Sequence, residues 1–189
     1  MSTPCFIIGA QRCGTTYLYH VLNEHPAIEM AHPVRPEPKF FLHDALYDRG
    51  LDFYQRTFFT GGSGATVQGE KSTSYMDSAV AAQRIAEAFP QARLIFLLRE
   101  PIARAISHYW FSVQHGVETL PMAEAFLHEA QRRHQFDPQR TSVSPYAYLR
   151  RGCYIEELLM YERYFPREQM YISLAEECIG QVQSVQQLY

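Results

Sequence analysis

The sequence predicts an α/β fold with a central parallel sheet of about five strands flanked by helices. Short apolar runs alternate along the 189 residues with segments of helical periodicity, which is the pattern of parallel strands joined by helical crossovers. The run at 94–98 is continuous, apolar and short, as expected for a parallel strand buried on both faces. Strands are therefore predicted near residues 5–8, 27–30, 66–70, 94–98 and 169–173.

The first predicted strand leads into a loop that is suited to binding an anion. Gly9 and Gly14 permit a tight turn whose N–H groups point inward, and the helix that follows adds the positive end of its dipole. Arg12 adds a permanent cation. The glycine spacing equals that of a Walker A loop, but a Thr-Thr pair stands at 15–16 where a nucleoside triphosphatase has Lys-Ser or Lys-Thr. The loop is therefore predicted to bind phosphate without the lysine of a nucleoside triphosphatase. The alternative is a plain β–α turn.

Composition favours one globular domain over residues 1–189, since 47% of residues are hydrophobic and 20% are charged. A formal net charge of −3 argues against general binding to nucleic acid or a membrane surface. Four scattered cysteines without a Cys-x-x-Cys pair predict free thiols rather than zinc or disulfides. The chain shows no basic-then-apolar leader and no apolar run near the ~20 residues that span a bilayer, so we expect a cytoplasmic protein.

The first half of the chain contains two further predicted helices. Residues 16–23 carry leucines and tyrosines at helical spacing, and this helix should stop before Pro26 because proline disfavours helix in the preceding residue. Three prolines between 33 and 38 predict a stiff exposed loop that leads into an aromatic pair at 40–41, expected in the core. Aromatic residues at helical spacing predict a helix over 52–59.

The second half is richer in helix. Ile85 and several alanines share one face of a predicted helix that ends at Pro90, and Pro101 marks the first turn of the next one. A polar helix bears His128 and His134, but histidines in such a setting are usually solvated, so no metal site is assigned. The predicted helices are 78–89, 102–113, 122–135, 155–165 and one that begins at 175.

The phosphate loop resembles the Gly-x-x-[Lys/Arg]-x-Gly-Thr-Thr loop of the sulfotransferases that use 3′-phosphoadenosine 5′-phosphosulfate (PAPS). This resemblance implies that the loop binds the 5′-phosphosulfate of PAPS, with PAP as the product and no metal ion. It also implies that Arg12 stabilises charge on the leaving phosphate oxygen. The loop residues assigned to donor binding are Gln11, Arg12, Cys13, Gly14, Thr15 and Thr16.

Residues 35–41 resemble the Lys-Glu-Pro-x-Phe-Phe stretch of the carbohydrate-type members, in which the glutamate is the catalytic base. Glu37 matches that glutamate. Pro36 replaces the usual lysine and removes a cation, although Arg35 and Lys39 lie on either side. The alternative is that this glutamate is an ordinary solvated loop carboxylate. Because some soluble relatives use histidine, two histidines are reserve candidates for the base, His32 and His43.

The third predicted strand ends in a motif similar to the family's Glu-Lys-[Ser/Thr]-x-x-Tyr. In the family its lysine lines the acceptor site at the carboxyl end of a parallel strand, which is where sites in open α/β sheets gather. Lys71 is therefore a candidate for the catalytic set. The alternative is that Glu70 and Lys71 form a surface charge pair.

Residues 97–109 resemble the family's 3′-phosphate motif, Leu-Arg-[Asp/Glu]-Pro-x-x-Arg-x-x-Ser-x-Tyr. Arg99 and Ser107 match its phosphate ligands. An arginine at the carboxyl end of a strand and a serine two turns into the next helix can converge on one dianion. The alternative is that Arg99 and Arg104 merely pair with Glu100 or with another helix.

The resemblance covers nearly the whole chain, in five ordered segments. The fifth, an Arg-Gly-x-Tyr element at 151–154, adds Arg151 as a contact on the 3′-phosphate side. The resemblance implies strand order 2-3-1-4-5, as in P-loop kinases, and in-line transfer of a sulfuryl group to a hydroxyl or amine of a carbohydrate or small-molecule acceptor. Family members usually continue for several dozen residues beyond the equivalent of Tyr189, so we expect the family's C-terminal segment to be lacking.

Two other functions compete with this interpretation. A P-loop small-molecule kinase would share the fold, but the loop lacks its lysine, and Arg99 follows the strongest strand where a kinase has a magnesium-binding aspartate. A non-catalytic nucleotide-binding remnant is the second alternative. Neither the acceptor nor the oligomeric state can be predicted. Four aromatic residues are expected in the core rather than at a sugar platform: Tyr75, Tyr109, Trp110 and Phe111.

Overall fold

The computed structural model describes residues 2–61, 64–137 and 141–179. Within these residues, five strands form one sheet in the order β2-β3-β1-β4-β5, and every pair of neighbours is parallel. The predicted fold class and strand order are confirmed. The strands are β1 (Thr3–Gly9), β2 (Ile28–Met30), β3 (Val67–Lys71), β4 (Arg93–Leu98) and β5 (Met170–Leu174).

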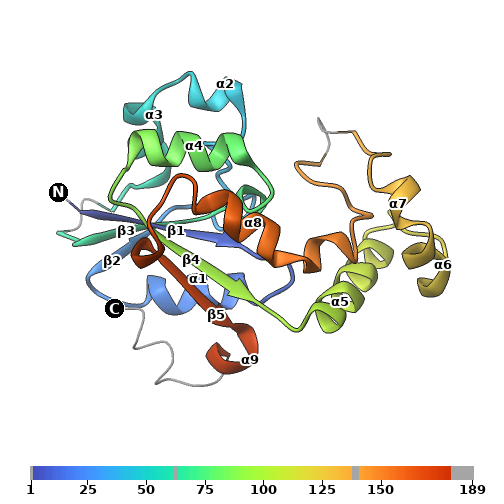
Figure 1. The fold of residues 1–189 in the computed structure, drawn as a ribbon. Coiled ribbons are helices and arrows are strands. Elements are labelled where there is room, and N and C mark those ends of the chain that lie inside the picture. The colour runs from blue at the N-terminus through green and yellow to red at the C-terminus, as the bar shows by residue number, and fades with distance from the viewer. Residues whose placement is uncertain (1, 62–63, 138–140, 180–189) are drawn as a thin grey trace.

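Helices cover both faces of the sheet (Figure 1). Helix α1 lies on one face, while α4 and α8 lie on the other. Helices α5, α6 and α7 extend beyond the end at which β4 finishes. The α-helices are α1 (Thr15–Asn23), α2 (Asp44–Tyr47), α3 (Leu51–Phe58), α4 (Ala79–Ala88), α5 (Pro101–Gln114), α6 (Met122–Leu127), α7 (Glu129–Arg132), α8 (Tyr154–Tyr161) and α9 (Ala175–Cys178).

The central position of β1 decides where a site can form. Its register places Ile7 beside Lys71 at the end of β3, and the amide of Ala10 donates to the carbonyl of Leu97 in β4 over 2.7 Å. The carboxyl ends of three neighbouring parallel strands therefore meet at one edge of the sheet. Ligands of open α/β sheets bind at this edge.

The core confirms the predicted burial of the aromatic pair in the loop after β2. Phe40 and Phe41 are fully buried, and the ring of Phe41 packs edge-on against Phe6 of β1 with centroids 5.6 Å apart. Burying each such ring contributes roughly 2–3 kcal/mol. These rings anchor a polar loop to the sheet, so the loop that carries Glu37 has a defined position.

The prediction of one continuous helix over 122–135 is wrong, because the structure has two short helices there. Two short helices, α6 and α7, meet at His128, whose φ of −96° and ψ of 8° interrupt the helical path. The buried carboxylate of Glu129 explains the break, because it accepts hydrogen bonds from the backbone amides of Leu149 and Arg150. A distant turn therefore reorients the chain at this point.

The four aromatic residues expected in the core divide into two pairs. Tyr75 and Tyr109 are buried, as expected. Trp110 and Phe111 are not, since 52% and 39% of their surfaces are exposed. They follow the inward-facing Tyr109 along α5, where the helix turns away from the small core that it shares with Tyr148.

Helix α9 confirms that a helix begins at residue 175, and residues 180–189 of that prediction lie outside the described residues. Residues 62–63 and 138–140 also lie outside them. Among the helices of the described chain, none has the length and hydropathy needed to cross a membrane.

Candidate active site

The loop between β1 and α1 has a backbone that favours glycine at one position and exposes free amides. Gly14, directly before α1, has a φ of 81°, and a Cβ there would lie 2.5 Å from Cδ1 of Ile179. Among the described residues, no side chain caps the amino end of α1. Because the first N–H groups of a helix have no partner within it, they are available to an anion. Arg12 also has a positive φ, of 69°, and its cation belongs to the same turn.

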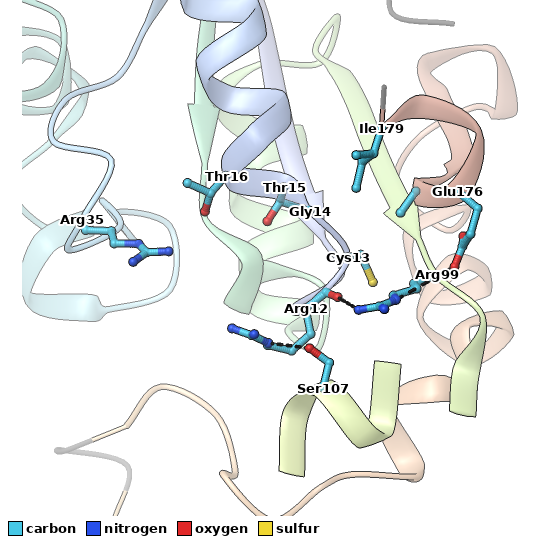
Figure 2. A pocket seen from close by; sticks show the side chains of 11 residues that line it. Arg12, Cys13, Gly14, Thr15, Thr16, Arg35, Arg99, Ser107, Glu176 and Ile179 are labelled. Atoms are coloured by element: carbon cyan, nitrogen blue, oxygen red, sulfur yellow. Dashed lines mark hydrogen bonds and ion pairs between the residues drawn. The ribbon is translucent and has the colours of Figure 1, made fainter. Parts of the chain in front are cut away.

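A cavity of about 570 Å³ opens in front of this loop (Figure 2). It collects residues from the loop, from the end of β4, from α5 and from α9. Seven of the residues predicted to bind the donor line it, namely Arg12, Cys13, Gly14, Thr15, Thr16, Arg99 and Ser107. The other lining residues are Arg35, Ala175, Glu176 and Ile179.

Arg12 links the loop to α5. Its Nε donates a hydrogen bond to Oγ of Ser107 over 3.2 Å, and its guanidinium lies 4.7 Å above the ring of Phe111. Arg99 approaches from β4 and donates from Nη1 to the carbonyl of Arg12 over 3.4 Å. The residues assigned to the 5′ and 3′ sides of the donor are therefore in direct contact around one cavity.

The alternative of a pair with Glu100 is wrong for Arg99, whereas the alternative of a pair with another helix holds, because its partner Glu176 belongs to α9. The carboxylate of Glu100 caps α5 instead, because it accepts from the amides of Ile102 and Ala103 over 2.9 and 2.7 Å. Arg99 has a looser partner in Glu176, whose carboxylate lies 4.0 Å from its Nε. Its guanidinium keeps donors that face the cavity.

The cavity is electropositive. The pKa of Arg12 is lowered first by burial, and then by the positive charges of Arg35 and Arg99. Like charges held together in a partly buried space favour an anion that separates them. Glu176 is the one carboxylate among the lining residues of the described structure. The lining therefore suits a ligand with several negative charges.

Glu37 and Lys71 contact each other near the main cavity, but neither is among the described residues that line it. Oε1 of Glu37 lies 2.5 Å from Nζ of Lys71, and Oε2 accepts from the amide of Thr73 over 3.0 Å. The hydroxyl of Thr73 donates to the same carboxylate. The Lys71 side chain is only 3% exposed and that of Glu37 15%, so Glu37 is not an ordinary solvated carboxylate.

The interpretation of Glu70 and Lys71 as a surface charge pair is wrong, because both are buried. Glu70 accepts hydrogen bonds from Tyr54 and Ser72 over 2.8 and 2.6 Å. Burial raises the pKa of Glu70 to about 7 despite these bonds. The two neighbouring side chains point to opposite faces of β3, as they must in a strand, so Lys71 is free to pair with Glu37.

Gln11 and Arg151 lie apart from the other predicted donor ligands. The guanidinium of Arg151 is held by the carboxylate of Asp77 and by the side-chain oxygen of Gln11. These residues line a separate, small space that also receives the buried Arg104. Asp77, in the segment after β3, therefore holds Arg151 in an ion pair. The Arg-Gly-x-Tyr element at 151–154 does not predict this partner.

Neither reserve base lines the main cavity. Nδ1 of His32 lies 3.1 Å from the hydroxyl of Tyr19, which fixes its ring against α1. Burial and the charge of Lys39 lower the pKa of His43, which stands directly before α2. Across the described residues, no group of three or more His, Cys, Asp or Glu side chains is arranged to hold a metal ion.

Several residues of the site have no role predicted from the sequence. Thr73 lies inside the Glu-Lys motif, and Arg35 lies beside Glu37 as a charged neighbour. Both carried a signal that could have identified them. Asp77 and Glu176 carried none, because their arginine partners are 74 and 77 residues away along the chain.

Comparison with known proteins decides the family. Residues 2–189 match the protein-family model described as the sulfotransferase domain. The chain belongs to this family. Among solved structures, a sulfotransferase from Alicyclobacillus acidocaldarius is 30% identical with a TM-score of 0.83, and the alignment covers 100% of this chain and 79% of that one. The family resemblance predicted from the sequence is confirmed.

Curated relatives of this sulfotransferase-domain chain are longer. Heparan sulfate glucosamine 3-O-sulfotransferase 6 of Mus musculus is 33% identical over 160 residues, which are 85% of this chain and 43% of that protein. Membrane-associated sulfotransferase kil1 of Dictyostelium discoideum is 35% identical over 114 residues, 59% of this chain and 23% of that protein. The chain thus spans less than half the length of these two relatives.

Proposed function

We propose that this sulfotransferase-domain chain transfers a sulfuryl group from PAPS to a hydroxyl or amine of a carbohydrate or small-molecule acceptor. The observation that carries the proposal is the contact of Arg12 with both Ser107 and Arg99 around one electropositive cavity. PAPS carries negative charge at its 5′ and 3′ ends. The loop amides suit the first, and Arg99 with Ser107 suits the second.

The chain's own residues would act by alignment and charge compensation. PAPS supplies an activated sulfuryl group, and such a transfer, like phosphoryl transfer, needs little covalent participation by the protein. In this proposal Glu37 takes the acceptor proton at its carboxylate, and the contacts of that carboxylate with Lys71 and Thr73 support a fixed position for it. Arg12 compensates the charge that develops on the departing phosphate oxygen.

The kinase alternative finds less support. Thr15 occupies the loop position of the P-loop lysine, and Arg99 follows β4 where a magnesium-binding aspartate would stand. A non-catalytic remnant would bind PAPS without transferring its sulfuryl group. Only an activity assay distinguishes such a remnant from an enzyme. For the remnant, PAP would stabilise the protein but no acceptor would be sulfated.

A thermal shift experiment tests the proposal. The protein is melted with PAP, with ATP and magnesium, and without ligand, because a ligand stabilises only the state that binds it. We expect the melting temperature to rise with PAP and to stay unchanged with ATP and magnesium. Incubation with PAPS and a panel of hydroxyl- and amine-bearing acceptors should then release PAP. A shift with ATP alone would overturn the proposal in favour of the kinase.

A further inference from the structure

Arg35 is a cation of the main cavity for which the chain supplies no counter-charge. It comes from the loop after β2, its side chain is exposed, and it lines the cavity together with Arg12 and Thr16. Among the described residues its guanidinium makes no hydrogen bond or ion pair. An arginine has five donors, and those of Arg35 are left for a ligand.

The neighbouring charged groups are already engaged. The carboxylate of Glu37, two residues along the same loop, is held by Lys71 and Thr73. Nζ of Lys39 donates to Oγ of Ser142 over 2.7 Å. Glu176 lies beside Arg99. No carboxylate of the described cavity lining is therefore left to neutralise Arg35.

The position of Arg35 indicates which part of a ligand it would meet. In Figure 2 Arg35 lies on the side of the cavity opposite Arg99 and Glu176, and the side chain of Arg12 extends toward it. The charge of Arg35 contributes to the lowered pKa of Arg12, so the two guanidinium groups act on the same space. Arg99 belongs to the 3′-phosphate side of the proposed donor, which leaves Arg35 at the other end.

The loop that carries Arg35 also carries Glu37. In an in-line transfer the sulfuryl group lies between the phosphate that leaves and the acceptor oxygen, whose proton Glu37 would take. Arg35 lines the same cavity as the phosphate loop, and Arg12 extends toward it, so its guanidinium lies on the side of the cavity where the sulfuryl group is expected. A planar guanidinium can bind two oxygens of such an oxyanion at once.

We infer that Arg35 is a donor-binding residue whose guanidinium binds the sulfuryl oxygens of PAPS. The inference rests on the proposed function and deepens it. It assigns to Arg35 a discrimination between PAPS, which has the sulfuryl group, and PAP, which lacks it.

Binding of PAPS and of PAP in the absence of acceptor tests this role by calorimetry. The proteins are the wild type, Arg35→Ala, Arg35→Lys and a control, Arg163→Ala, which removes an exposed arginine outside the cavity lining. We expect Arg35→Ala to lower the affinity for PAPS about tenfold, because charge-assisted hydrogen bonds are lost. The affinity for PAP should change less than about twofold. Arg35→Lys should keep part of the PAPS affinity, and Arg163→Ala should bind both ligands as the wild type does.

Two outcomes would overturn the inference while leaving the proposed function intact. In one, Arg35→Ala weakens PAP as much as PAPS, which would make Arg35 a general source of positive potential. In the other, both affinities are unchanged and only the acceptor KM rises, which would place Arg35 on the acceptor. A wild-type protein that binds neither nucleotide would instead defeat the proposed function itself, and the inference with it. Unchanged melting temperatures would show that the variants are folded.

Discussion

The ammonium group of Lys71 lies 2.5 Å from a carboxylate oxygen of Glu37, and this contact joins the end of β3 to the loop after β2. The two residues are 34 positions apart in the sequence. Because the lysine is almost fully buried, its charge needs this partner. The contact therefore fixes the proposed base at the edge of the sheet where the strands end.

Glu37→Gln should abolish proton acceptance while retaining the shape of the loop. We expect the rate of sulfation to fall by a factor on the order of 10² to 10⁴, with PAP affinity close to that of the wild type. The amide oxygen can still accept from Lys71 and Thr73, but the buried Lys71 loses its counter-charge, so we also expect a lower free energy of unfolding. Single-turnover kinetics together with calorimetry against PAP would measure the two effects separately.

His43→Ala is the matched control for the identity of the base. Its imidazole is a reserve candidate, and burial and the charge of Lys39 lower its pKa. We expect this variant to retain most of the wild-type rate. An active Glu37→Gln beside an inactive His43→Ala would transfer the role of base to the histidine.

Arg12→Ala should remove charge compensation at the leaving phosphate oxygen. We expect kcat to fall by a factor on the order of 10² to 10³, with a smaller effect on donor affinity. The variant also releases Ser107 and Phe111, which Arg12 contacts in this structure. Steady-state kinetics with PAPS as the varied substrate provide the measurement. Wild-type turnover in this variant would remove the role assigned to Arg12.

Arg99→Ala should erase most of the preference for PAP over 5′-AMP. Each charge-assisted hydrogen bond contributes about 1.5–3 kcal/mol, so the 3′-phosphate should be worth roughly two orders of magnitude in wild-type affinity. We expect the variant to bind 5′-AMP almost as before. Calorimetry with both nucleotides checks this. A preference that persists in the variant would shift the recognition to Ser107 or would require Arg151 to leave Asp77.

Glu70 should make stability depend on pH. Its pKa is raised by burial from 4.5 to about 7, so between these values the folded state holds a proton that the unfolded state has released. The resulting stabilisation is fully present below pH 4.5 and is lost as pH rises through 7. This pKa shift of Glu70 corresponds to about 3 kcal/mol in the free energy of unfolding.

Urea unfolding at pH 5 and pH 8 measures this contribution. Glu70→Gln keeps the group neutral, so we expect the fall in unfolding free energy between the two pH values to shrink by about 3 kcal/mol. The control is Glu24→Gln, which changes an exposed carboxylate beyond α1. An unchanged pH dependence in Glu70→Gln would mean that the folded protein carries this carboxylate ionised.

Local features determined the fold. The continuous apolar run of β4 and the turn at Gly14 each depend on a few consecutive residues, because strand burial and a positive φ are short-range properties. Arg12, Arg99 and Ser107 were predicted from the family resemblance, and the structure brings them to one cavity because the ends of neighbouring parallel strands meet. The sequence by itself was therefore sufficient for the sheet, the phosphate loop and much of the cavity lining.

Tertiary structure decided the pairing of charges. Arg151 lies on Asp77, Lys71 lies on Glu37, and Arg35 faces the cavity without a carboxylate of its own among the described residues. It also decided the helix break at His128, where Glu129 holds a distant turn. Such contacts join residues far apart in the chain, and each loop offers several groups of the right charge. Which of them meet depends on how the loops pack against the sheet, and periodicity and spacing carry no information about that packing.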